Sequence, residues 1–192
     1  MLQSRAVSYP SRVPVPEVLR STMLRRFRSL ERDERAIVMR VSAIGRDFDF
    51  RIAVAAAGCA EATVRCALER ARGLQILVAL EADRYSFRHA LTREIVYGEL
   101  LSGQVRPLHR RIAKTLEAAF ESGEPVLEAL AYHAWTGGYT QRGIRYNELA
   151  GDNAVAVHAC KDARNYYSRA RSLTEIHSSQ YSRLTRKLCA LE

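Results

Sequence analysis

The chain has 192 residues, of which 47% are hydrophobic, so it is long enough for one large domain or two small domains with a real core. Its formal net charge of +9 would suit an anionic partner, but every cation except Lys114, Lys161 and Lys187 is an arginine. Such a bias reflects genome composition as readily as nucleic-acid binding. No apolar run approaches the ~18 residues of a membrane span and no signal peptide is evident, which predicts a soluble cytoplasmic protein.

The first helices are predicted from capping residues and apolar spacing. Residues 1–15 contain several serines and prolines without periodicity and are expected to form a flexible lead-in. Pro16 suits the first position of a helix, because the N–H that proline lacks would be unpaired there. Asp33 is the expected cap of a second helix, which Gly45 would end in a left-handed conformation.

Two further helices are predicted on either side of Gly58. Asp47 or Asp49 can cap a short third helix, which Gly58 would close. A fourth helix is expected over residues 61–72, closed by Gly73 and burying the apolar side chains of one face. The N-terminal half of the chain is therefore expected to begin with four helices.

A change of periodicity marks residues 85–97. Before them, residues 74–80 form a short apolar run suited to a buried strand, and residues 85–88 alternate like a strand that returns beside it. After His89 the apolar spacing becomes helical, so a strand is expected to end and a helix to begin at that residue. Several helices followed by a two-stranded hairpin is the order of a winged helix, which is predicted to span residues 16–102.

Only helices are expected in the remainder of the chain. The longest amphipathic helix is predicted over residues 104–120 and is broken by the Ser122–Pro125 segment. The later helices are expected from Val126 to the break at Gly137–Gly138, and over residues 140–158, 161–173 and 179 onward.

These later helices contain half of a tetratricopeptide-repeat (TPR) signature. Ala163, Tyr167 and Ala170 have the small–aromatic–small spacing of a second TPR helix, and Ala150–Gly151 supplies the small pair of the first. Asn147 stands where an aromatic residue is expected. The helices are therefore predicted to be TPR-like.

The predicted TPR-like domain covers residues 103–192, including the helical linker, and is incomplete because the chain stops partway into a repeat. Helical repeats bury their apolar faces against neighbouring repeats and need a polar cap at the end. No such cap is evident, so exposed apolar surface is expected around Tyr181, Leu184 and Leu188.

The sequence carries no catalytic or metal-binding motif. It has no phosphate loop, no dinucleotide-binding glycine motif and no signature of a zinc protease or serine hydrolase. No two histidines stand four apart as helical metal ligands would, and the four cysteines are expected to be reduced core thiols. The histidines are His89, His109, His133, His158 and His177. We therefore expect a protein that is not an enzyme and holds no metal or cofactor of its own.

A DNA-binding winged helix is one alternative, because Gly58 and the helix after it fit the packing of a helix-turn-helix. The would-be recognition helix exposes Glu61 and Glu69 among its arginines. Carboxylates repel DNA phosphates and would offset much of the attraction of those arginines. A winged helix that packs against protein is therefore favoured, and nucleic acid is not an expected partner.

Two blocks of sequence carry a resemblance to a known family. They are Tyr-Ser-Phe-Arg-His-Ala-Leu-Thr-Arg-Glu-Ile-Val-Tyr at residues 85–97 and Leu-His-Arg-Arg-Ile-Ala at residues 108–113, with support from residues 15–18 and 44–48. Over about residues 15–175 the chain resembles the winged-helix and TPR-like region of bacterial STAND-class signalling ATPases. These include large LuxR-type transcriptional regulators and ATPase-linked adenylate cyclases. The chain lacks their ATPase domain, so the resemblance implies an internal slice or a truncated product.

The resemblance assigns a role to His89. In the wider class, a histidine at this strand-to-helix junction contacts the phosphate of bound ADP and holds the receptor closed. The start of a helix favours anions, which gives a physical reason for such a contact. His89 is therefore a candidate nucleotide sensor when an ATPase domain is present, and a capping or packing histidine is the alternative.

The resemblance also implies a function for the whole chain. It would be a non-catalytic regulatory and interaction module that works with an ATPase domain, either its own or a separate one. The module would couple the ADP or ATP state of that domain to the binding of a protein or small-molecule inducer on the helical repeats. Its output would be signal transduction or transcription regulation. The alternative is a free-standing TPR-like adaptor that binds only protein, and neither function requires a membrane.

Overall fold

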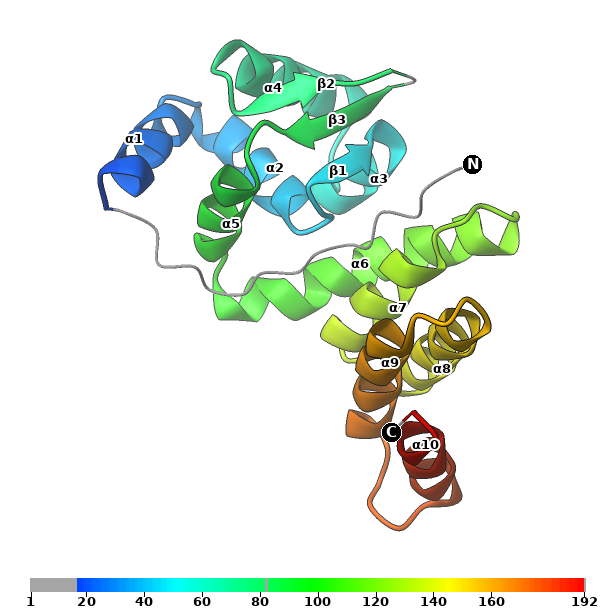
Figure 1. The fold of residues 1–192 in the computed structure, drawn as a ribbon. Helices are drawn as coiled ribbons and strands as arrows, with labels where there is room; N and C mark the ends of the chain where they lie inside the picture. Colours follow the sequence, from blue (N-terminus) through cyan, green and yellow to red (C-terminus); the bar gives the residue numbers. More distant parts are fainter. Residues whose placement is uncertain (1–16, 82, 192) are drawn as a thin grey trace. The chain divides into compact units, whose positions relative to one another are not determined.

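The computed structural model describes residues 17–81 and 83–191, which form ten helices and a three-stranded antiparallel sheet (Figure 1). The chain divides into two compact units between Leu108 and His109. The predicted lead-in and the helix start at Pro16 lie outside the described residues. The predicted mainly helical fold is confirmed, whereas its winged-helix and TPR-like assignments stay predictions.

The first unit begins with two helices, α1 (Glu17–Arg28) and α2 (Arg32–Ser42). The prediction that Asp33 caps the second helix is wrong, because α2 begins after Glu31. The N–H of Glu31 donates to the carboxylate of Glu34 at 2.9 Å, a reciprocal arrangement that satisfies the helix start without Asp33. α1 and the turn after it bury Leu24, Phe27 and Leu30, and α2 buries Ile37, Val38 and Val41.

Gly58 ends α3 (Phe50–Ala57) as predicted. Its φ of 67° and ψ of 34° are left-handed, a conformation that glycine adopts without steric cost. The start of α3 is also as expected, because the Asp49 carboxylate accepts a hydrogen bond from the backbone N–H of Arg51 at 3.2 Å. Local capping chemistry therefore fixes where this short helix begins and ends.

Of two other predicted glycine stops, the one at Gly45 is wrong and the one at Gly73 agrees with the structure to within one residue. α2 ends at Ser42, and Gly45 has a nearly extended φ of 159° rather than a left-handed one. Gly73 is the last residue of α4 (Glu61–Gly73), because the N–H of Leu74 still bonds back into the helix. The left-handed residue here is Gln75, with a φ of 59°.

The sheet has three strands rather than the predicted two. They are β1 (Asp47–Asp49), β2 (Leu77–Ala79) and β3 (Arg84–Phe87), in the order β1-β3-β2. Both neighbours of the central strand β3 run antiparallel to it. The residues predicted as helix caps therefore form an edge strand, and the expected hairpin of β2 and β3 is present.

An aromatic cluster explains why β1 joins this sheet. The Asp-Phe-Asp sequence of β1 alternates, so Phe48 turns inward and stacks on Tyr85 with ring centroids 6.0 Å apart. Phe87 lies at the same distance from Phe48 and is fully buried. On the opposite face of the sheet, the Ser86 hydroxyl donates to the Asp47 carboxylate at 2.5 Å.

The strand-to-helix junction continues into α5 (Ala90–Gly98), as predicted. Its inward face includes Ile95 and Val96, both buried. Arg93 is also buried and donates from Nε to the backbone carbonyl of Ser42 at 2.8 Å. This bond ties α5 to the end of α2 and so fixes the start of α5 relative to the sheet.

The second unit is entirely helical within residues 109–191. The helices after α6 (Ser102–Glu121) are α7 (Leu127–Thr136), α8 (Thr140–Ala156), α9 (Cys160–Ser172) and α10 (Ser179–Cys189). Their bounds lie within two residues of the predicted ones. α8 packs against both α7 and α9, and α10 packs against α9. No helix in the described part of the chain is long and apolar enough to cross a membrane.

Small residues let α8 and α9 approach closely. Ala163 and Ala170 are fully buried on α9, with Tyr167 between them at 3% exposure. The Tyr167 ring lies against Gly151 of α8, where a Cβ atom added to the glycine would fall 2.4 Å from Cε1 of the ring. Asn147 is buried and its amide donates to two backbone carbonyls at 2.8 Å, so a polar residue fills the expected aromatic position.

The expected apolar surface on α10 is only partly present. Leu184 is fully buried and Tyr181 and Leu188 are half-buried, so the prediction is wrong for Leu184. Leu184 inserts into the same apolar cluster as Ile144 and Tyr167. α10 therefore covers the face that the sequence suggested would be left open.

Candidate functional site

His89 lies at the junction between β3 and α5, where it is the N-cap residue of the helix. Its backbone is extended, with φ −131° and ψ 137°, and its carbonyl accepts the N–H of Thr92 at 3.0 Å. The imidazole is exposed and makes no capping hydrogen bond to α5. An exposed ring at a helix start can approach an external anion, because the helix dipole is positive there.

The residues around His89 are already held by other contacts. Arg88 donates to the side chain of Gln75 at 2.6 Å, and Thr92 is buried with its hydroxyl 3.5 Å from the sulfur of Met23. The neighbours thus fix the backbone on both sides of His89. The nucleotide-sensing role of His89 itself stays a prediction.

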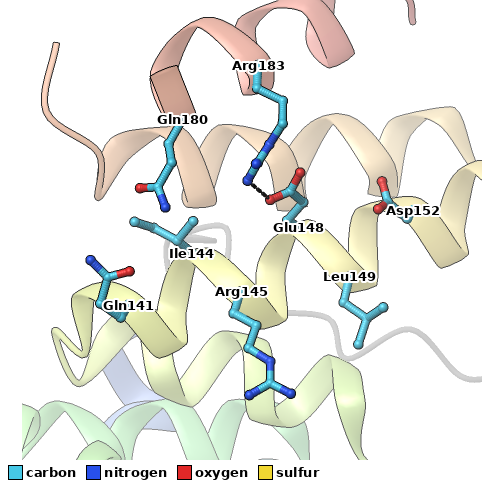
Figure 2. Close-up of a pocket in the computed structure, with 8 residues that line it drawn as sticks. All are labelled: Gln141, Ile144, Arg145, Glu148, Leu149, Asp152, Gln180 and Arg183. Carbon is cyan, nitrogen blue, oxygen red and sulfur yellow. Dashed lines mark hydrogen bonds and ion pairs between the residues drawn. The ribbon is translucent and has the colours of Figure 1, made fainter. Parts of the chain in front are cut away.

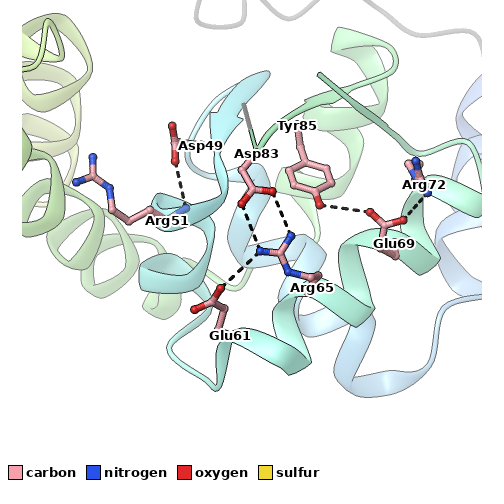
Figure 3. A network of polar contacts seen from close by, with 8 residues as sticks. All are labelled: Asp49, Arg51, Glu61, Arg65, Glu69, Arg72, Asp83 and Tyr85. Atoms are coloured by element: carbon pink, nitrogen blue, oxygen red, sulfur yellow. Dashed lines mark hydrogen bonds and ion pairs between the residues drawn. The ribbon is translucent and has the colours of Figure 1, made fainter. Parts of the chain in front are cut away.

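A network of ion pairs covers the exposed face of α4 (Figure 3). Arg65 binds both carboxylate oxygens of Asp83, at 3.1 and 3.4 Å, and approaches Glu61 at 3.5 Å. Its guanidinium also lies 3.9 Å from the centroid of the Phe50 ring. The hydrogen bond from Arg65 lowers the pKa of the Asp83 carboxyl, as expected for an ion pair.

The same face of α4 contains a second pair. Arg72 contacts Glu69 at 2.6 Å, and the Tyr85 hydroxyl donates to Glu69 at 3.3 Å. Burial, and then the charge of Glu69, raise the pKa of Tyr85. Two arginines of the would-be recognition helix, Arg65 and Arg72, are therefore already engaged by carboxylates.

A groove of about 430 Å³ lies between α8 and α10 (Figure 2). From α8 it is lined by Gln141, Ile144, Arg145, Glu148, Leu149 and Asp152, and from α10 by Gln180 and Arg183. Ile144 is buried, whereas Leu149 is 37% exposed and offers an apolar contact. The groove lining combines amides, charges and one open leucine.

Ion pairs hold the two sides of this groove together. Glu148 contacts Arg183 at 2.6 Å and Lys187 at 3.0 Å, and Lys187 also contacts Asp152 at 2.6 Å. Partial burial lowers the pKa of Lys187, but hydrogen bonds to the two carboxylates outweigh that effect and raise it overall. Burial and the hydrogen bond that Tyr167 donates to Asp152 at 2.6 Å raise the pKa of that phenol.

The groove is not among the features predicted from the sequence. Gln141, Arg145, Leu149 and Asp152 recur at helical spacing on α8, which is the one signal that could have revealed a shared exposed face. The facing residues of α10 lie about one helix pair further along the chain. Their position depends on how α10 folds back, which no local pattern predicts.

The structure brings together two histidines that stand far apart in the sequence. Nδ1 of His109 lies 2.9 Å from Nδ1 of His133, and both rings are fully buried. No group of three or more His, Cys, Asp or Glu side chains within residues 17–81 and 83–191 could hold a metal ion. The expectation of core thiols is wrong for Cys66, Cys160 and Cys189, which are exposed, although all are free.

Comparisons with protein-family models, curated proteins and solved structures found no match for the chain. The resemblance in residues 85–97 and 108–113 therefore stays a hypothesis. The candidate functional features of the described residues are the exposed His89, the ion-paired face of α4 and the groove between α8 and α10.

Proposed function

We propose that the chain is a non-catalytic regulatory and interaction module that works with a STAND-type ATPase domain in the cytoplasm. The observation that carries this proposal is the state of His89. Its imidazole is exposed at the start of α5 and takes no part in capping the helix. An imidazole in this position can contact the phosphate of a nucleotide that another domain holds.

In this proposal the two units have different tasks. The first unit docks on the ATPase domain and senses ADP or ATP through His89. The second unit binds a protein or small-molecule inducer in the groove between α8 and α10. Nucleotide exchange removes the contact at His89 and shifts the balance between two states of the assembly, provided that the contact differs between those states.

The His89→Ala variant tests this role. With the ATPase domain supplied, we expect it to weaken ADP binding by about tenfold and to raise basal signalling, because one hydrogen bond to a charged phosphate is lost. Calorimetric titration with ADP measures the change. His158→Asn is the matched control, since His158 is exposed and its φ of 59° is tolerated by asparagine. Unchanged ADP affinity in His89→Ala would rule out the sensing role.

The second candidate function is a free-standing adaptor that binds only protein, and the open groove favours it. The genomic neighbourhood separates the two candidates, since an in-frame phosphate-loop segment upstream supports the regulatory module. If no such segment is present, the adaptor function, which needs only the groove, is favoured.

A photo-crosslinking amino acid placed at Leu149 tests the groove directly. Leu149 lines the groove and is 37% exposed, so we expect it to crosslink a discrete partner in cells, read out by gel shift and mass spectrometry. The control position is Ser168, which is exposed on α9 outside the groove. Equal crosslinking at both positions would argue against a binding groove.

Nucleic acid is not part of this proposal. The Arg65 and Arg72 side chains are engaged by carboxylates of the same unit. Binding to phosphate would require these pairs to break, which removes much of the electrostatic gain that drives association with DNA. The paired face of α4 supports packing against protein instead.

A further inference from the structure

His109 of α6 and His133 of α7 form a direct contact inside the second unit. Both imidazoles are fully buried, with Nδ1 atoms 2.9 Å apart and ring centroids 4.8 Å apart. A hydrogen bond between two ring nitrogens needs one N–H and one lone pair. Only one proton can therefore lie between these two atoms.

We infer that this pair is an acid-sensitive joint between α6 and α7. A proton from solvent adds to the accepting Nδ1, and its lone pair becomes an N–H bond. The hydrogen bond from the other Nδ1 is then lost, and two N–H groups face each other within 2.9 Å. The helices must separate to relieve this contact, whatever the two Nε2 atoms bind.

Tyr132 and two arginines, Arg169 and Arg110, belong to the surroundings of the pair. On α7, Tyr132 turns toward both imidazoles, with centroid distances of 5.6 and 5.3 Å. On α9, Arg169 lies 5.5 Å from the centroid of the Tyr132 ring. On α6, Arg110 follows His109 directly and donates to a carbonyl at the end of α7 at 2.7 Å. Nearby cations disfavour the protonated form of an imidazole.

Two carboxylates of the surrounding helices act on side chains of α8 and α9. Glu117 of α6 accepts hydrogen bonds from Arg142 at 2.9 Å and from the Tyr146 hydroxyl at 2.8 Å, both on α8. Burial, and then the charge of Glu128 on α7, raise the pKa of Tyr166 on α9 to about 12.

The sign of the pH effect follows from proton counting. In the unfolded chain both histidines bind protons below an ordinary pKa of about 6.5. Counting this nitrogen alone, the folded pair binds one proton fewer, because the accepting Nδ1 is blocked. The unfolded state therefore gains stability as pH falls, and the folding equilibrium constant drops by up to about tenfold per pH unit below about 6.5.

Urea unfolding of the full chain between pH 7.5 and pH 5.5 tests the inference. Trp135 is the only tryptophan of the chain and lies on α7, so its fluorescence reports this unit. Carboxylates, with ordinary pKa values near 4, contribute little in this range. In His133→Asn the amide can still bond to His109, as donor or as acceptor. We expect the wild type to lose up to about tenfold in the equilibrium constant from pH 6.5 to pH 5.5 and the variant to lose markedly less.

His177→Asn is the control, because His177 is exposed with a φ of 71° that asparagine tolerates. It should keep the wild-type pH dependence. If the pair has only a structural role, His133→Asn lowers stability equally at every pH and keeps the wild-type slope of stability against pH. That result would overturn the inference. If His133→Asn does not fold, nitrogen-15 NMR of the wild-type histidine rings tests the inference instead. We expect one ring to carry a proton on Nδ1 and the other ring to have none there. Two rings with the same protonation at Nδ1 would refute the inference.

Discussion

Replacing Leu184 with alanine is expected to lower the free energy of unfolding of the helical unit by about 2–5 kcal/mol. The Leu184 side chain is fully buried in the cluster that joins α10 to α8 and α9. Alanine would remove its packing and leave a cavity at the inner side of α10. Urea unfolding followed by circular dichroism measures the loss, and hydrogen exchange shows whether the amides of α10 open first.

Glu148→Gln is the matched control for this prediction. It breaks the ion pairs with Arg183 and Lys187 but leaves the apolar cluster intact. The two basic side chains are 48% and 30% exposed, so solvent screens these pairs and the expected loss is about 0–1 kcal/mol. A larger loss in Glu148→Gln than in Leu184→Ala would mean that charge, rather than packing, holds α10.

The Leu184→Ala variant also tests the proposed role of the groove. The groove exists only while α10 lies against α8 and α9, since α10 provides one of its sides. Leu184→Ala should therefore also abolish crosslinking from Leu149, although it does not line the groove.

The features that the sequence predicted well are those that local chemistry determines. Gly58 ends α3 because a left-handed residue is needed there, and Asp49 starts it because its carboxylate can reach the N–H of Arg51. The small–aromatic–small spacing around Tyr167 correctly identified the buried face of α9. Each of these signals lies within a few residues of the structure that it predicts.

The features that were missed depend on partners far away in the chain. Asp47 is 39 residues from Ser86, with which it pairs across the sheet, so local chemistry predicts a helix cap where β1 forms. Arg183 is 35 residues from Glu148, and no periodicity within α8 or α10 indicates that they meet. Long-range pairing, rather than propensity, decides both the third strand and the groove. The strand-to-helix junction at His89 could be located because it depends only on two adjacent elements.

Gly151→Ala is expected to destabilise the helical unit by about 1–3 kcal/mol, even though alanine favours a helix by about 1 kcal/mol over glycine. The added carbon would lie 2.4 Å from Cε1 and 2.6 Å from Cδ1 of Tyr167. That ring is 3% exposed and its hydroxyl is held by Asp152 at 2.6 Å, so it cannot move aside. α8 and α9 must separate instead, which urea unfolding followed by Trp135 fluorescence would detect.

Gly103→Ala is the control, because Gly103 lies in α6 with no atom within 4 Å of an added carbon. It should be neutral or stabilising by up to about 1 kcal/mol. A double-mutant cycle with Tyr167→Leu then isolates the cause. If the clash with the ring is responsible, Gly151→Ala costs less in the Tyr167→Leu background than in the wild type. Additive losses would show that Gly151 is needed for its backbone rather than for the close approach of the two helices.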